Sequence, residues 1–179
     1  RIVAGADGSI IAHGGLRTDA ILLAHAHRHH AEAPVLRELA DLCLALTPAS
    51  ERHAETALTG DAFVRAVAAW PLRTPPALPD PCPYPIAVGA LAAGHGIALA
   101  DTLVGFLTAA VHSQVSVAVR LVPIGQEDGL AILAALEPRV AALADLCQHA
   151  ALDDIGSVAY GADIAQMRHE TLRTRIFRS

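Results

Sequence analysis

Residues 101–119 read DTLVGFLTAAVHSQVSVAV, and this segment indicates the fold more directly than any other. Between Thr102 and Val119 it contains no Asp, Glu, Lys or Arg, and its apolar side chains cover more than one stripe of a helix. A helix that is apolar nearly all round usually lies at the centre of its bundle. Because the Asp101 carboxylate can accept first-turn N–H groups, we expect a long central helix capped by Asp101.

The same segment approaches the length of a membrane span, which needs about 20 apolar residues. However, the polar residues His112 and Gln114 lie in its middle, and Asp101 and Arg120 flank it. We therefore favour a buried helix of a soluble protein and expect no contact with a membrane. Buried polar groups need partners, so His112 and Gln114 are expected to fix a helix contact or to line a polar channel.

The composition of the whole chain agrees with a helical fold. The 179 residues suit one domain, and the hydrophobic fraction is 53% while the aromatic fraction is only 3%. The core is therefore expected to be aliphatic and rich in alanine, a good helix former. We predict an all-α, single-domain bundle of about seven to nine helices. A net charge of −5 argues against nucleic-acid binding, which needs a basic surface.

A proline-rich connector divides the helices into two groups, since residues 71–85 hold seven of the eleven prolines. It is expected either to pack over the core or to form a flexible loop. Helices are predicted before it from Leu16, from Pro34 and from about Ser50 towards Trp70, the last with Gly60 as a weak point. After it we expect a short helix that ends near Gly94, the long helix, two helices at about 127–136 and 138–150, and a last one at about 157–171.

Four histidines, His25, His27, His29 and His30, form the most metal-like pattern. His25 and His29 are four residues apart, so they share one face of a helix and could clamp a nickel or zinc ion. No carboxylate or thiolate nearby is expected to complete the site. A polar helix face near a turn is the favoured interpretation.

The three cysteines, Cys43, Cys82 and Cys147, form no CxxC pair. Together with the lack of a visible secretory signal, this predicts a reducing, cytoplasmic compartment. Cys43 and Cys147 are expected in the core, whereas Cys82 in the connector could expose a thiolate to a soft metal. No nucleophile with a base and an orienting partner is apparent, so we expect no enzyme.

The C-terminal tail, residues 168–179, is basic in a chain that is acidic overall, and it interleaves arginines with Leu172, Ile176 and Phe177. Arginine and aromatic side chains often dominate binding energy at protein interfaces. We therefore expect the tail to dock into a partner protein.

Three segments carry a family likeness: YPIAVGALAAGHGI at 84–97, VRLVPIGQEDG at 119–129 and ADIAQMRHETLRTRIFRS at 162–179. The chain resembles the UreF family of urease accessory proteins over these segments, and less strongly back to about residue 16. The third segment is the most specific, because RHET followed by R-x-F-R-S is unlikely to arise by chance. Residues 1–15 depart from the family pattern, which opens with a helix and a Gly/Ser/His-containing motif.

The resemblance implies an all-α, non-enzymatic homodimer that binds the scaffold protein UreD/UreH and recruits or regulates the GTPase UreG. That assembly inserts nickel into apo-urease, so nickel is expected only in transit and no tightly bound cofactor is expected. The alternative is a protein that holds nickel directly on its histidines. Partner contact is assigned to Arg168, His169, Glu170, Arg173, Arg175, Phe177 and Arg178. The segment from Arg120 to Gln126 is the next candidate, for contact with a second copy of the chain or with UreG. A metal role is considered only for His25 and His29.

Overall fold

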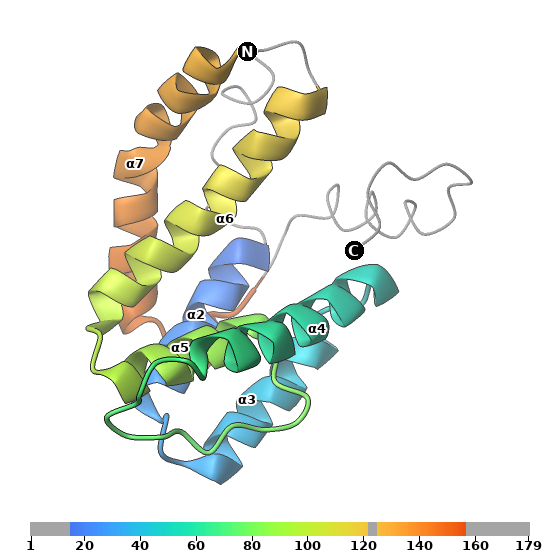
Figure 1. Ribbon diagram of the computed structural model, residues 1–179, viewed down its shortest axis with the longest axis vertical. Helices are drawn as coiled ribbons and strands as arrows, with labels where there is room; N and C mark the ends of the chain where they lie inside the picture. The colour runs from blue at the N-terminus through green and yellow to red at the C-terminus, as the bar shows by residue number, and fades with distance from the viewer. Residues whose placement is uncertain (1–14, 122–124, 157–179) are drawn as a thin grey trace.

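The computed structural model describes residues 15–121 and 125–156, and within these ranges every regular element is a helix (Figure 1). The all-α prediction is therefore confirmed. The helices are α2 (Gly15–Arg28), α3 (Ala33–Ala45), α4 (Ser50–Val67), α5 (Tyr84–His95), α6 (Leu99–Leu121), α7 (Gln126–His149) and the short 3-10 helix η1 (Leu152–Asp154). The helix predicted at about 157–171 lies outside the described residues.

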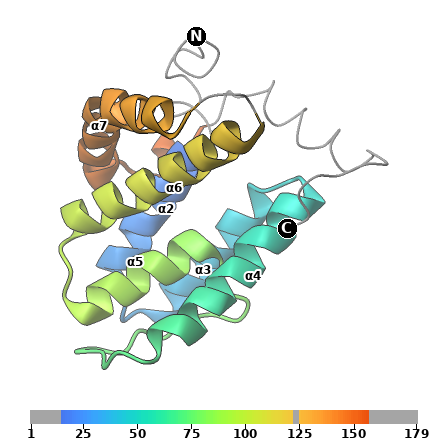
Figure 2. The same ribbon diagram turned by 45° about the horizontal axis from the view of Figure 1, so that its top comes forward.

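The central helix is α2, and the prediction that the long helix at 101–119 is central was wrong. Five consecutive residues of α2, from Ala20 to Ala24, are completely buried, and α2 packs against α3, α5, α6 and α7 (Figure 2). Its small alanines allow neighbours to approach on several sides. In α6 only one stripe is buried, and the opposite face, which includes Gly105 and Thr108, is exposed.

By length and composition, α6 could cross a membrane. Its buried stripe nevertheless packs against α2 and α7, as in the core helix of a soluble protein. The helix also begins at Leu99, two residues earlier than predicted, so Asp101 lies in the first turn rather than at the cap. His112 and Gln114 are exposed, which contradicts the expectation that they are buried polar groups in need of partners.

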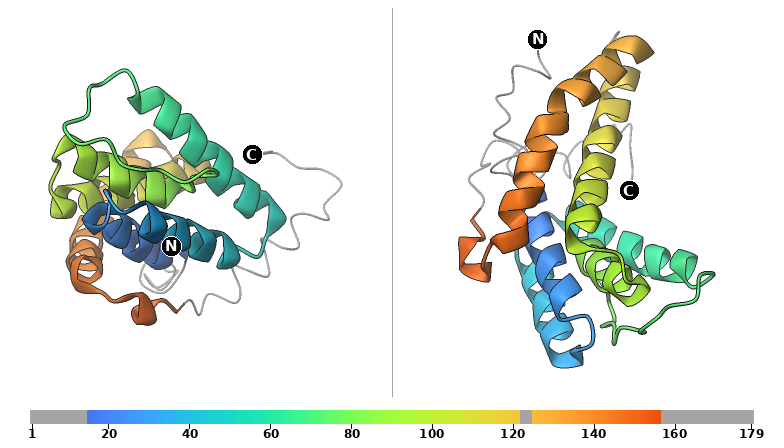
Figure 3. Two further views of the ribbon diagram at one scale, coloured as in Figure 1. Left: turned by 90° about the horizontal axis from the view of Figure 1, so that it is seen from below. Right: turned by 90° about the vertical axis from the view of Figure 1, so that its left-hand side faces the viewer.

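The helix α7 is continuous from Gln126 to His149, although two helices were predicted. Pro138 lies inside it and is exposed. A proline inside a helix removes one backbone hydrogen bond. The helix α7 continues past Pro138 because its residues before and after the proline pack on the same core cluster. Leu136 before Pro138 and Val140 after it both contact the larger core cluster. The hairpin of α6 and α7 extends beyond the other helices (Figure 3, right).

The proline-rich connector packs over the core, which decides between the two predicted alternatives. Pro83 and Pro85 are fully buried, and the N–H groups of Arg73 and Thr74 donate to the Gly94 carbonyl at 2.9 and 3.0 Å. Gly60 was predicted to be a weak point of α4. Instead, it is the one buried residue of this helix. A Cβ there would overlap the backbone of the connector at Cys82 and would lie 2.7 Å from the Tyr84 nitrogen.

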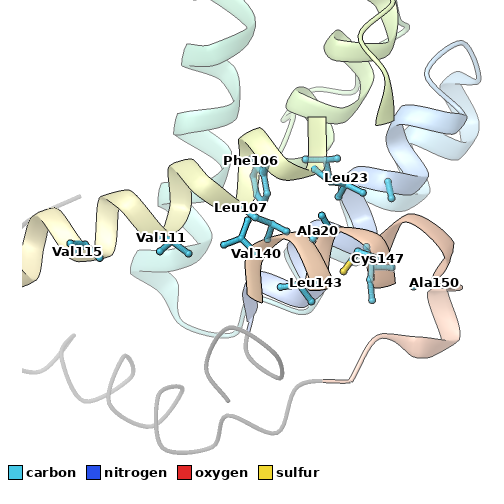
Figure 4. Close-up of a cluster of buried hydrophobic side chains, with 14 residues drawn as sticks. Ala20, Leu23, Phe106, Leu107, Val111, Val115, Val140, Leu143, Cys147 and Ala150 are labelled. Atoms are coloured by element: carbon cyan, nitrogen blue, oxygen red, sulfur yellow. The ribbon is translucent and has the colours of Figure 1, made fainter. Parts of the chain in front are cut away.

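The core has two clusters of buried side chains that meet along α2. The larger one joins α2, α6 and α7 (Figure 4), and the smaller one joins α2, α3 and α5 with Cys82 of the connector. Three aromatic rings link α4, α5 and α6. The Tyr84 centroid lies 5.6 Å from that of Phe63 and 5.8 Å from that of Phe106.

Candidate partner-binding surface

A groove at the far end of the α6–α7 hairpin brings two predicted partner-binding residues together. Arg120 from the end of α6 and Gln126 from the start of α7 both line it. The groove has a volume of about 130 Å³, which is enough for one or two side chains of a partner. The two residues are six positions apart in the sequence, and both line this groove because α6 and α7 pack side by side.

The groove exists because α6 and α7 approach each other closely at Gly129. A Cβ at Gly129 would lie 3.0 Å from Val119 Cγ2 and 3.5 Å from Val115 Cγ1, so a larger residue would require the Val119 side chain to shift. The Asp128 carboxylate accepts the Gly125 N–H at 3.1 Å and caps the start of α7. The glycine and the cap together hold the hairpin in this geometry.

The groove combines an apolar floor with a charged rim. Val115, Val119 and Leu133 provide the floor, whereas Arg120 and His112 provide the polar rim. Leu130 at the edge is 65% exposed and Leu121 next to Arg120 is 53% exposed. Arg120 makes no ion pair with any residue of the described ranges. Such a surface suits an apolar side chain flanked by a carboxylate, a common arrangement at protein interfaces.

Of the predicted histidine pair, His25 lies in α2 and His29 in the turn just after it, and the two rings stack with centroids 6.4 Å apart. However, the ring nitrogens have other partners. His25 Nε2 bonds the Ala150 carbonyl at 3.1 Å, and His29 Nδ1 bonds a carboxylate oxygen of Glu32 at 2.9 Å. Glu32 is a nearby carboxylate, but it does not complete a site of three metal ligands with the two histidines. Because both acceptors are oxygens, each of these nitrogens is the donor.

No three His, Cys, Asp or Glu side chains in the described part of the chain come close enough to hold a metal ion. Burial lowers the pKa of His25, since desolvation disfavours the imidazolium form. The Ala150 hydrogen bond opposes this shift, and the charges of Arg28 and His29 add to it. The pair alone is therefore an incomplete metal site.

The histidines instead connect α2 to the ends of other helices, a role that the sequence pattern did not predict. In addition to the His25 bond, His27 Nε2 bonds the Ile97 carbonyl in the turn between α5 and α6 at 2.8 Å. Carbonyls near helix ends lack intrahelical donors, so they accept such bonds. The sequence shows several hydrogen-bond donors close together in one helix. It does not show their acceptors, because the Ile97 and Ala150 carbonyls lie 70 and 125 positions away from His27 and His25.

All three cysteines are buried, so the possibility of an exposed Cys82 thiolate was wrong, whereas the core positions of Cys43 and Cys147 are confirmed. Cys82 is only 3% exposed, and burial raises its pKa to about 12, with a further contribution from Asp61. Its backbone N–H donates to the Asp61 carboxylate at 3.2 Å, which ties the connector to α4. A neutral, buried thiol is not a ligand for a soft metal at neutral pH.

The tail residues predicted to contact a partner lie outside the described residues. They are Arg168, His169, Glu170, Arg173, Arg175, Phe177 and Arg178. The structure therefore locates two of the nine predicted partner-binding residues, Arg120 and Gln126, and places both at the groove.

Comparison with known proteins gives consistent results. A family model described as UreF matches residues 8–137. The urease accessory protein UreF of Agrobacterium fabrum is 48% identical over 171 residues, which cover 96% of this chain and 77% of the relative. UreF of Rhizobium johnstonii is 48% identical over 172 residues, with the same coverage. UreF of Rhodopseudomonas palustris is 46% identical over 178 residues, which cover 96% of this chain and 73% of the relative.

Proposed function

Because the chain belongs to the UreF family of urease accessory proteins, we propose that it is an adaptor in the complex that loads nickel into urease. It is a non-catalytic protein of urease maturation. In this proposal it acts as one helical domain and as a homodimer in the cytoplasm. It binds the scaffold protein UreD/UreH and recruits or regulates the GTPase UreG, and the assembly acts on apo-urease.

The observation that carries the proposal is the likeness to UreF proteins over 96% of the chain at 48% identity. Two surfaces are assigned to partner contact. One is the tail, residues 168–179, with its arginines and Phe177. The other is the α6–α7 groove, where Arg120 and Gln126 lie side by side. Nickel is cargo of the whole assembly here, and His25 and His29 are not assigned to hold it, because no third His, Cys, Asp or Glu of the described residues completes a site with them.

Removal of residues 168–179 is expected to abolish capture by UreD/UreH. The tail supplies the arginine and aromatic anchors, which commonly account for most of the binding energy of an interface. The measurement is co-purification of full-length and shortened chains with tagged UreD/UreH, followed by addition of UreG. Circular dichroism of the shortened chain should show an unchanged helical signal. Capture that persists without the tail would contradict this assignment.

Replacement of Arg120 with alanine tests the groove separately. We expect affinity for the UreD/UreH–UreG assembly to fall by about 1–2 kcal/mol, the range for an arginine anchor at an interface. The matched control is Arg139→Ala, which removes an equally exposed arginine from the outside of α7. Calorimetry or biolayer interferometry at fixed salt would compare the two variants. Equal, small effects would exclude the groove as a contact surface.

A further inference from the structure

The chain that follows α7 does not leave the protein at the end of that helix but runs back along α2 (Figure 1). Ala150 is 7% exposed in the larger core cluster, and Ile155 packs against both core clusters. Between them, the Asp154 carboxylate accepts the Ala151 N–H at 2.8 Å and stabilises the turn of η1. Residues 150–155 are therefore held against the body up to the point where the described part of the chain ends.

Three side chains of α2 hold this segment, and we call them the α2 clamp: Arg17, His25 and Arg28. Arg28 donates to the Gln148 carbonyl, His25 Nε2 donates to the Ala150 carbonyl at 3.1 Å, and Arg17 donates to the Asp154 carbonyl at 2.6 Å. The last carbonyls of a helix have no intrahelical donor, and a cation near them also interacts favourably with the helix dipole. The clamp thus satisfies carbonyls at the end of α7 and beyond it.

The order of these contacts defines the path of the chain. Moving from the last turn of α2 to its first, the donors bond carbonyls progressively later in the sequence. The segment after α7 is therefore antiparallel to α2. It ends beside the first turn of α2, where Arg17 is located. Cys147 Sγ lies 4.0 Å from the Arg17 carbonyl oxygen. The end of α7 therefore also packs against the first turn of α2.

We propose that the α2 clamp is a positioning device that fixes the point on the body from which the chain continues into the C-terminal segment, residues 157–179. This inference rests on the proposed function, in which the tail and the α6–α7 groove contact one partner assembly. When two linked contacts engage one partner, the second binds with an effective concentration set by the length and geometry of the linker. Ala150 stays in the larger core cluster, but loss of Arg17 and Arg28 would loosen the chain after it and lengthen that linker. Arg17 and Arg28 would then influence affinity without touching the partner.

The test compares two double variants that remove the same charge. Arg17→Met/Arg28→Met removes the two arginine donors of the clamp, leaves His25 in place and keeps the aliphatic stems, and Arg37→Met/Arg65→Met removes two exposed arginines from α3 and α4. We expect the clamp variant to bind the UreD/UreH–UreG assembly about tenfold more weakly than the wild type, because the effective concentration of the tail falls. The control variant should bind within about twofold of the wild type. In the clamp variant, amide hydrogen exchange at residues 151–155 should become faster.

Further variants separate positioning from a loss of structure. Arg17→Lys/Arg28→Lys keeps a charged donor at each position and should recover most of the affinity. Arg17→Met alone releases only the Asp154 carbonyl, and it replaces the double variant if that variant loses its helical signal. If the clamp and control variants bound equally well and binding still required residues 168–179, this inference would be overturned, but the assignment of the tail to partner contact would stand. Binding of the wild type that does not depend on the tail would overturn the tail assignment and the inference with it.

Discussion

The Gly89→Ala variant is expected to lose about 2–3 kcal/mol of unfolding free energy, the usual cost of forcing an extra group into a packed core. Gly89 lies where α5 crosses α2 most closely. A Cβ there would overlap the Leu23 carbonyl and would lie 3.1 Å from the His27 nitrogen. Both are backbone atoms of the central helix, so no side-chain rotation can relieve the contact. Urea unfolding followed by circular dichroism would measure the loss.

Gly105→Ala is the matched control. Gly105 is also within a helix, but a Cβ there would meet nothing within 4 Å. The higher helix propensity of alanine should therefore stabilise this variant by up to about 1 kcal/mol. The two substitutions are chemically identical and are predicted to have opposite signs. If both stabilised the protein, α2 and α5 could not approach each other as closely as the structure indicates.

The Phe106→Ala variant is expected to lose about 3–5 kcal/mol, as is typical when a buried phenylalanine is removed. Phe106 is 7% exposed, and its ring contacts that of Tyr84, which in turn contacts Phe63. The cavity would therefore lie where α4, α5 and α6 are joined. Denaturant unfolding should show a lower midpoint with an unchanged slope.

Val104→Ala, on the same helix, serves as its control. Val104 is 43% exposed, so its loss should change stability by about 0.5 kcal/mol or less. A loss for Val104→Ala that approached the loss for Phe106→Ala would contradict the exposed position of this face. In the proposed homodimer, such a result would indicate that a second copy covers α6.

The structure connects the two proposed contact regions through α2. This helix packs against both α6 and α7, and its clamp holds the segment that leads to the tail. One helix therefore packs against both helices of the groove and against residues 150–155. A partner that uses both surfaces would recognise their spacing as well as their side chains.

Much of the local structure could be predicted from the sequence. The excess of alanine and leucine with few aromatic residues indicated helices, and the prolines of residues 71–85 placed the connector correctly. The end of α5 near Gly94 was also predicted, and Gly96 there has a φ of 77°, which favours glycine. The family likeness pointed to Arg120 and Gln126, which both line the groove, and their role in partner contact stays a prediction. These features depend on residues close in sequence, whose steric limits act within a few positions.

Only the tertiary structure decided which helix is central, what the polar side chains of α2 bond and whether Cys82 is accessible. Periodicity shows that a helix has an apolar face, but burial depends on which neighbours cover it, and α6 is covered on one side only. Similarly, the sequence shows donors in His25 and His27, but their carbonyl acceptors come from helix ends far along the chain. Pro138 did not break α7, because packing on both sides of it outweighs one lost hydrogen bond. By itself, the sequence determined the helical content and the family; contacts between residues distant in sequence determined the rest.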